Sequence, residues 1–326
     1  MFKPSCLVIF CCIFSALIGT TSVRAAEQAE EFSAWLEGLR REALSQGISA
    51  ATVDRALADI APLPRVIELD CSQPELLQTL PEYLAARVTE TRVNEGKRML
   101  RRFPTWLGRS ERNYRVQRRF IVALWGIETN YGLFTGGFPV IPALATLAHD
   151  SRRSSYFRGE LLTLLQLLDQ GRLQLDQLEG SWAGAMGQCQ FMPSSFHRFA
   201  VDADGGEVNL WASVPDVFAS TANYLKQSGW KDDQTWGREV RLPKDFDVSL
   251  AGLKKRLPLS QWQTLGIRRS NGRALPRRNI EASLIMPDGA DGPAYLVYDN
   301  FRVLLSWNRS EAFAVAVGTL ADRLVK

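Results

Sequence analysis

The apolar residues in the first third of the chain recur at helical spacing. Phe32, Leu36 and Leu39 fall on one face of a helix near the start of a region, 27–119, that this pattern predicts to be helical. The segment 117–128 (QRRFIVALWGIE) is apolar on most of its sides. A helix without a broad polar face is normally buried, so we expect this segment to form a central helix of the core.

Two later helices have clear predicted ends. Residues 156–170 are rich in leucine and stop at Gly171, and residues 214–227 stop just before Gly229. Between them lies the segment 180–196 (GSWAGAMGQCQFMPSSF), which combines small, aromatic and amide side chains and contains no charge. This composition is typical of a tightly packed loop that leads into a helix, and not of a solvated linker.

The pattern changes after residue 230. Residues 238–242 alternate between polar and apolar, proline and glycine recur at short intervals, and 294–297 and 301–306 are strand-like. These features predict a fold of the α+β class, mainly α, that ends in a helix. The predicted divisions are an N-terminal helical region at 26–116, a helical core formed by 117–231 and 306–326, and a small β-containing insertion at 232–305.

The N-terminus predicts export. Lys3 precedes an uncharged apolar run, 6–19, which is shorter than the roughly 20 residues that a membrane-spanning helix requires. Small or aliphatic residues then mark a cleavage site after Ala25. We therefore expect residues 1–25 to be a secretory signal peptide and the mature protein to be periplasmic; a membrane anchor is the alternative.

Three of the five cysteines lie in this predicted signal peptide. Neither Cys11 nor Cys12 follows the small residue that a lipid-attachment site requires, so lipoprotein anchoring is not expected. Cys71 and Cys189 remain in the mature chain. They could pair in an oxidising compartment, but each lies in an apolar or semi-apolar stretch, which favours buried free thiols.

Charge and histidine content exclude several classes of function. The formal net charge is +4, and loss of Lys3 and Arg24 with the signal peptide lowers it to +2, which argues against nucleic acid as a partner. The two histidines, His149 and His197, are too few for a histidine-rich zinc site, and no GxSxG elbow, P-loop or GxGxxG motif is present. Carboxylate chemistry without a cofactor remains.

Glu128 is the acidic residue that stands out. It ends the apolar segment 117–128 and is the only charged residue between Arg119 and Asp150. Desolvation disfavours an ionised carboxylate, so we expect the pKa of Glu128 to be raised. A carboxylic acid that stays protonated near neutral pH can act as a general acid and protonate a glycosidic oxygen. A purely structural carboxyl group at a helix end is the alternative.

Two segments resemble the motifs of the lytic murein transglycosylase B family. Residues 123–132 (ALWGIETNYG) are similar to the motif that contains the catalytic glutamate of that family, and 180–196 is similar to its second signature. The resemblance implies a lysozyme-like helical core with an N-terminal helical part and a small β part. Further matches extend it in order along essentially the whole mature chain: 67–70, 73–75, 215–230 and 294–308.

The resemblance also implies a reaction that does not consume water. Glu128 would protonate the oxygen that links N-acetylmuramic acid to N-acetylglucosamine in peptidoglycan. It would then act as the base for the C6 hydroxyl of the same muramic acid, which attacks C1 and leaves a 1,6-anhydro sugar. An internal hydroxyl has a high effective concentration, and the acetamido group of the substrate can stabilise the charge at C1. No second carboxylate is then required.

A set of substrate-binding residues follows from the same resemblance. Ser181 and Gln190 would hydrogen-bond around Glu128 and the sugar. The other positions would line the groove, form aromatic subsites or lie near the glycan and its peptide: Phe191, Met192, Tyr83, Tyr131, Arg152, Arg153, Tyr156, Tyr224 and Asn308. For each aromatic residue, packing in the core is the alternative.

The sequence departs from the family pattern at two points. Trp307 and Phe313 stand where the family can carry tyrosine, so those hydroxyl groups are absent here. Some relatives also contain an EF-hand-like calcium loop. Here Asp202 and Asp204 occupy the first and third positions of such a loop, but the loop is short and lacks the donor at its fifth position. We therefore do not expect tight calcium binding.

Two other functions are compatible with the sequence. A hydrolase of the muramidase type would need a second carboxylate about 5–9.5 Å from Glu128, for which Asp150, Glu160 and Asp202 are the candidates. A non-enzymatic peptidoglycan-binding protein would keep its function without Glu128. In all three interpretations the partner is the glycan strand of peptidoglycan, and neither nucleic acid nor a stable membrane span is expected.

Overall fold

The computed structural model describes residues 16–72, 78–150 and 152–326. The first fifteen residues of the predicted signal peptide therefore lie outside the described residues. The remainder of that peptide begins α1 (Ala16–Ser45), a helix that continues past the predicted cleavage site. Within the described ranges, no helix combines the length and the apolar character needed to cross a membrane.

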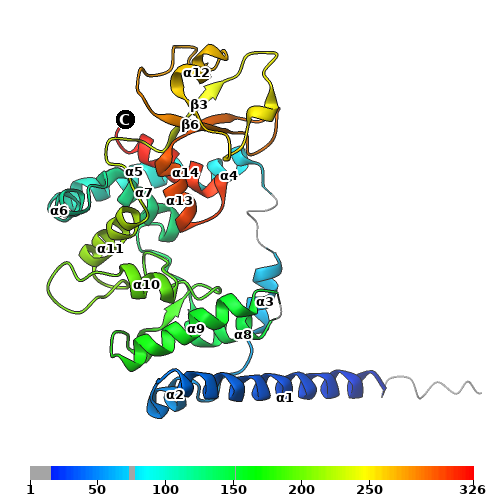
Figure 1. Ribbon diagram of the computed structural model, residues 1–326. Coiled ribbons are helices and arrows are strands. Elements are labelled where there is room, and N and C mark those ends of the chain that lie inside the picture. Colours follow the sequence, from blue (N-terminus) through cyan, green and yellow to red (C-terminus); the bar gives the residue numbers. More distant parts are fainter. Residues whose placement is uncertain (1–15, 73–77, 151) are drawn as a thin grey trace, which may run out of the picture.

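Helices from two separate stretches of sequence form the lower group in Figure 1. α2 (Ala50–Ala56) packs on α9 (Ser154–Asp169), and α3 (Pro64–Cys71) packs on α8 (Val140–His149). The leucines of α9 recur at helical spacing, and most are fully buried. The predicted helix at 156–170 is thereby confirmed.

The central helix predicted at 117–128 is confirmed as α7 (Arg118–Thr129), in which residues 120–127 are all buried. Helices from distant parts of the chain pack around it (Figure 1). Because α7 is covered on several sides, apolar residues occupy nearly its whole circumference. The surrounding helices are α5 (Glu90–Arg102), α6 (Pro104–Tyr114), α11 (Val214–Gln227) and α14 (Glu311–Arg323), with α4 (Leu80–Arg87) packed on α14.

A small antiparallel sheet lies at one end of the molecule (Figure 1). Its strand order is β4-β6-β7-β3-β5, and the central pairing places Gly237 opposite Val297 and Ser283 opposite the same residue. Trp262 and Tyr298 fill a separate apolar core beneath it. The bounds are β3 (Gly237–Arg241), β4 (Leu257–Pro258), α12 (Leu259–Thr264), β5 (Arg268–Arg269), β6 (Glu281–Ile285) and β7 (Ala294–Val297).

The strand predicted at 301–306 is wrong, because this segment belongs to the helix α13 (Asp299–Trp307). Phe301 and Leu304 are both fully buried, and their separation of three residues is a helical spacing. A short apolar run of this kind is also compatible with a strand. Buried Asn300 fixes the start of α13, since its side chain accepts from the Lys231 amide at 2.7 Å and donates to the Lys231 carbonyl at 2.8 Å. The segments before and after the insertion are therefore joined to each other at Lys231 and Asn300.

Two short strands and one short helix shape the region between α7 and α11. β1 (Phe138–Pro139) pairs with β2 (Glu179–Gly180), and α10 (Pro193–Phe199) follows the uncharged segment 180–196. Both cysteines of the described chain are free: Cys189 is buried as expected, whereas Cys71 is exposed. Cys71 is exposed because it is the last residue of α3, at the surface of the lower group.

Candidate active site

Glu128 lies at the C-terminal end of α7, and its side chain is partly buried. The residues before it anchor the helix in the core, so the position of the carboxyl group is set by a rigid element. The C-terminal end of a helix carries a partial negative charge, which disfavours an anion there. Oε1 of Glu128 accepts a hydrogen bond from Nε1 of Trp307 at 2.7 Å.

The chain reverses direction directly after Glu128. Asn130, Tyr131 and Gly132 all have positive φ angles, of 51°, 63° and 83°. Such a run of left-handed residues is costly for side chains other than glycine and persists only when neighbours hold it in place. Thr129 provides part of this support: its hydroxyl donates to the Gln188 carbonyl at 3.1 Å and accepts from the Gly132 amide at 3.0 Å.

The segment 180–196 forms tight turns beside this loop. The Ser181 hydroxyl accepts from the Ala185 amide at 3.0 Å, which uses Ser181 to close its own turn. A second turn pairs Met186 with Phe191 and places Gln190 at its tip with a φ of 53°. The side-chain nitrogen of Gln190 donates to two backbone carbonyls, of Thr135 at 3.0 Å and Gly187 at 2.9 Å. Its oxygen Oε1 has no hydrogen-bond partner among the described residues, and so remains an acceptor for a ligand.

Three aromatic rings form a cluster beside Glu128, with Trp307 in contact with the carboxyl group. The ring of Trp307 lies 4.7 Å from that of Tyr224 and 5.3 Å from that of Phe191. The Tyr224 hydroxyl donates to the Ser306 carbonyl at 2.6 Å, and burial raises the pKa of Tyr224. A pocket of about 410 Å³ opens beside these rings and is lined in part by Ser194, Arg198, Tyr224 and Ser306. The predicted residues Glu128, Phe191 and Tyr224 are therefore brought together by a residue, Trp307, that the sequence did not mark as functional.

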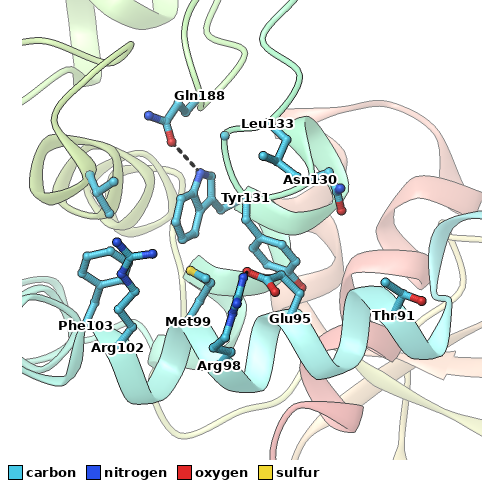
Figure 2. A pocket seen from close by; sticks show the side chains of 13 residues that line it. Thr91, Glu95, Arg98, Met99, Arg102, Phe103, Asn130, Tyr131, Leu133 and Gln188 are labelled. Atoms are coloured by element: carbon cyan, nitrogen blue, oxygen red, sulfur yellow. Dashed lines mark hydrogen bonds and ion pairs between the residues drawn. The ribbon is translucent and has the colours of Figure 1, made fainter.

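Tyr131 points away from this cluster toward α5 (Figure 2). Its hydroxyl donates to the Arg92 carbonyl at 2.7 Å, and burial raises its pKa. Together with Trp125 and Gln188 it lines a pocket of about 370 Å³ whose lining residues do not include Glu128. The indole of Trp125 donates to the Gln188 side chain at 2.8 Å. Tyr131 and Trp125 therefore stabilise the loop that follows Glu128.

A second group of predicted residues gathers on the lower helices. Arg152 donates to Asp70 at 2.9 Å, and Arg153 forms an ion pair with the other carboxylate oxygen of Asp70. The Asp70 side chain is only 4% exposed, while both arginines keep almost half of their surface. Tyr156 is half-exposed nearby, and its pKa is raised to about 12, chiefly by burial and also by Glu160. Asp70 thus fixes two cations that face solvent, a role that the sequence had not assigned to it.

Comparisons with known proteins show the family to which the chain belongs. Residues 31–322 match the family described as the Transglycosylase SLT domain. The chain belongs to this family. It is also 35% identical over 250 residues to membrane-bound lytic murein transglycosylase B of Escherichia coli strain K12, a match that covers 72% of this chain and 64% of that protein. The chain therefore spans slightly less than two thirds of the length of this curated relative.

Solved structures agree with the family assignment. SltB3 from Pseudomonas aeruginosa, in complex with NAG-anhNAM-pentapeptide, has a TM-score of 0.85 and 45% identity, and the match covers 90% of this chain and 79% of that one. The E. coli lytic transglycosylase Slt35 in complex with calcium has a TM-score of 0.76 and 29% identity, covering 89% and 92%. The predicted family and fold class are confirmed.

The three candidates for a second catalytic carboxylate all accept hydrogen bonds from donors of their own. Buried Glu160 accepts from the amide and hydroxyl of Ser194 at 2.8 and 2.7 Å, which caps the start of α10. Asp150 accepts from Arg152, and although burial opposes the change, these hydrogen bonds lower the pKa of Asp150. Asp202 accepts from three successive backbone amides of its own loop, of which the amide of Gly205 does most to lower its pKa.

The calcium candidates meet a third carboxylate that was not predicted. Oxygens of Asp202, Asp204 and Asp216 lie within 4.8 Å of one another. However, both oxygens of buried Asp216 accept backbone amides, of Ala203 and Asn209, at 2.8 Å each. Asp204 accepts from the hydroxyl of Ser213, the residue at the twelfth position where a calcium loop needs a bidentate acid. The loop is thus held by its own amides and by Ser213, and its third acid is Asp216 and not an acid at the twelfth position.

The remaining predicted residues lie as follows. Asn308 ends α13, and its side chain accepts from the Ser310 amide at 3.0 Å, just beyond Trp307. Tyr83 is buried on α4 with the Arg87 guanidinium 5.5 Å from its ring centroid, and Met192 is partly buried at the start of α10. The structure also contains a partly buried carboxyl group that was not predicted, Glu311 in the first turn of α14, whose pKa is raised by burial.

Proposed function

We propose that this chain is a peptidoglycan lytic transglycosylase that cleaves the MurNAc-β-1,4-GlcNAc bond and uses Glu128 as general acid and then as base. The observation that carries this proposal is a partly buried carboxyl group at the end of a rigid helix, hydrogen-bonded to Trp307, whose ring packs on Tyr224 at the wall of a pocket. Family membership supports the same chemistry. The structure of SltB3 in complex with NAG-anhNAM-pentapeptide is consistent with it.

In the proposed reaction, Glu128 gives its proton to the glycosidic oxygen as the bond between C1 and that oxygen breaks. The C6 hydroxyl of the same muramic acid then bonds to C1, and its proton passes to Glu128. The enzyme returns to its starting state, and the product ends in a 1,6-anhydro ring. The raised pKa expected for Glu128 stays a prediction, and its burial and its place at the C-terminal end of α7 favour it.

The neighbouring residues have proposed roles in binding the glycan. Gln190 would hydrogen-bond to the reacting sugar through its side-chain amide. Ser181, Met192 and Asn308 would line the groove around the same sugar. Tyr224 and Phe191 would support the sugar ring through the Trp307 side chain. The exposed pair Arg152 and Arg153, with Tyr156, would contact acidic groups of the peptide or glycan.

The mass of the products tests this proposal directly. Purified peptidoglycan digested by the protein should release disaccharide-peptides that end in anhydro-muramic acid, each lighter by one water than a hydrolysis product. Release of reducing ends would identify a muramidase instead. Binding to the sacculus without any release would identify a wall-binding protein.

We further propose that the reaction needs no metal or other cofactor. The proton transfers involve one side chain and the substrate, and the Asp202 loop is held by its own amides and by Ser213. Digestion in the presence of EDTA should therefore proceed at the same initial rate as digestion with added calcium. A rate that falls on chelation and recovers with calcium would contradict this proposal.

The proposed location is the periplasm, reached through the signal peptide predicted at 1–25. The curated relative is described as membrane-bound. N-terminal sequencing of protein recovered from a periplasmic extract should begin just after Ala25. A full-length N-terminus in the membrane fraction would favour an anchor.

A further inference from the structure

We propose that the indole of Trp307 is the positioning group of Glu128: it holds Oε1 as a hydrogen-bond acceptor and so sets the orientation and the pKa of the carboxyl group. This inference rests on the proposed function, because it concerns the same carboxyl group. The two residues are 179 positions apart in the chain, and their atoms Nε1 and Oε1 are 2.7 Å apart. The donor is an indole N–H, which differs chemically from a hydroxyl group.

The difference lies in what each group can donate or accept. An indole nitrogen is a donor only, whereas a tyrosine hydroxyl can donate or accept. A tyrosine hydroxyl could accept a hydrogen bond from a protonated carboxyl group, so that either carboxyl oxygen could carry the proton. With Trp307 as the neighbour, Oε1 is the acceptor in both protonation states of Glu128. The proton of Glu128 is therefore never shared with the Trp307 nitrogen.

The indole is itself held firmly. Its ring lies 4.7 Å from that of Tyr224 and 5.3 Å from that of Phe191, and Tyr224 is tied to the backbone of Ser306, the residue before Trp307. Trp307 also ends α13, whose core residues Phe301 and Leu304 are buried. A donor with so little freedom fixes the carboxyl plane, which is what positioning requires.

Several side chains around Glu128 keep one charge state near neutral pH, whereas Glu311 on α14, which packs on α7, is a carboxyl group whose pKa is raised by burial. The pKa of Cys189, raised to about 12 by burial and further by the charge of Glu128, keeps this thiol neutral. Burial raises the pKa of Tyr224, on α11, and of Tyr131, which faces α5. The guanidinium of Arg92 on α5 stays charged. Arg119, which is also on α7, forms an ion pair with Asp322. It lies about 14 Å from Glu128 along the helix axis.

The test compares the pH dependence of kcat in wild type and Trp307→Phe. Only protonated Glu128 can act as the acid, so kcat falls as the pH rises through its pKa in the complex. A donor to Oε1 favours the ionised form, so its removal raises that pKa. The high-pH limb should move up by about one pH unit, and kcat at the optimum should fall about tenfold while KM changes little.

A second variant separates the hydrogen bond from packing. Replacement of Trp307 by 3-benzothienylalanine exchanges the N–H for sulfur and keeps the ring system, so it should reproduce the same shift. The matched control is Trp236→Phe, which removes another buried indole that donates to a carboxylate, that of Asp322 at 3.1 Å. That variant should leave the high-pH limb in place.

The outcomes are distinct. An unmoved limb in both Trp307 variants overturns the inference, and so does a shift in Trp307→Phe alone, because packing would then be responsible. If the wild type releases reducing ends, the proposed function fails on product mass, independently of any pH shift. If the variants still release anhydro ends at reduced kcat with the shifted limb, both proposals are supported.

Discussion

Replacing Glu128 by glutamine is expected to lower the initial rate of anhydro-product release by at least about 10²–10⁴-fold. Glutamine has nearly the same shape, and its carbonyl oxygen can still accept from Trp307, so the fold and the packing of α7 should persist. What it cannot do is give up and recover a proton near neutral pH. The measurement is the rate of release of soluble fragments from purified peptidoglycan, with binding to the same material determined in parallel.

Glu311→Gln is the matched control for this experiment. Glu311 is another partly buried carboxyl group, and burial raises its pKa, but it lies in the first turn of α14, and the Trp307 indole donates to Glu128 instead. The rate should stay near that of the wild type. A Glu128→Gln enzyme that keeps more than about a tenth of the wild-type rate would rule out Glu128 as the acid. Normal binding without lysis would exclude a protein that only binds the wall.

The helical part of the fold could be predicted because local patterns decide it. The segment 117–128 has no broad polar face, and only burial among other helices suits such a segment. Segment 301–306 could not be assigned in this way. Its apolar residues fit both a strand and a buried helix, and the choice depends on contacts with Lys231, which is distant in sequence.

The residues of the site also differ in whether a local sequence pattern reveals them. Glu128 could be found because a lone acid at the end of an apolar helix is unusual in any sequence. Its partner Trp307 could not, because a contact across 179 positions leaves no local pattern. Tyr131 shows the opposite case: it lies next to Glu128 in the motif, but the left-handed turn that follows the helix aims its ring at α5.

Asp70 and Glu160 show why acids are difficult to assign from sequence. Each is charged and close in sequence or space to the predicted residues, yet one fixes Arg152 and Arg153 and the other caps α10. Both roles depend on which donors the fold brings to the carboxylate. The position of a hydrogen-bond donor is a property of the folded chain, and spacing along the sequence does not encode it.

Gly136→Ala is expected to destabilise the protein by about 3 kcal/mol or more and to abolish wall lysis at the same time. Gly136 has a φ of 111°, which L side chains rarely adopt, and it lies against the turn that carries Ser181. A β-carbon at this position would overlap the carbonyl group of Gly180 and come within 2.6 Å of the Ser181 amide nitrogen. These are backbone atoms of β2 and of the next turn, so they cannot rotate away as a side chain could.

The neighbouring glycine supplies the control. Gly137 has ordinary backbone geometry, and a β-carbon there would meet no atom within 4 Å, so Gly137→Ala should keep both stability and activity. Urea unfolding measures the first quantity and fragment release the second. If Gly136→Ala unfolds within about 1 kcal/mol of the wild type, the close approach of Gly136 to the Gly180 carbonyl group is not what stabilises this turn.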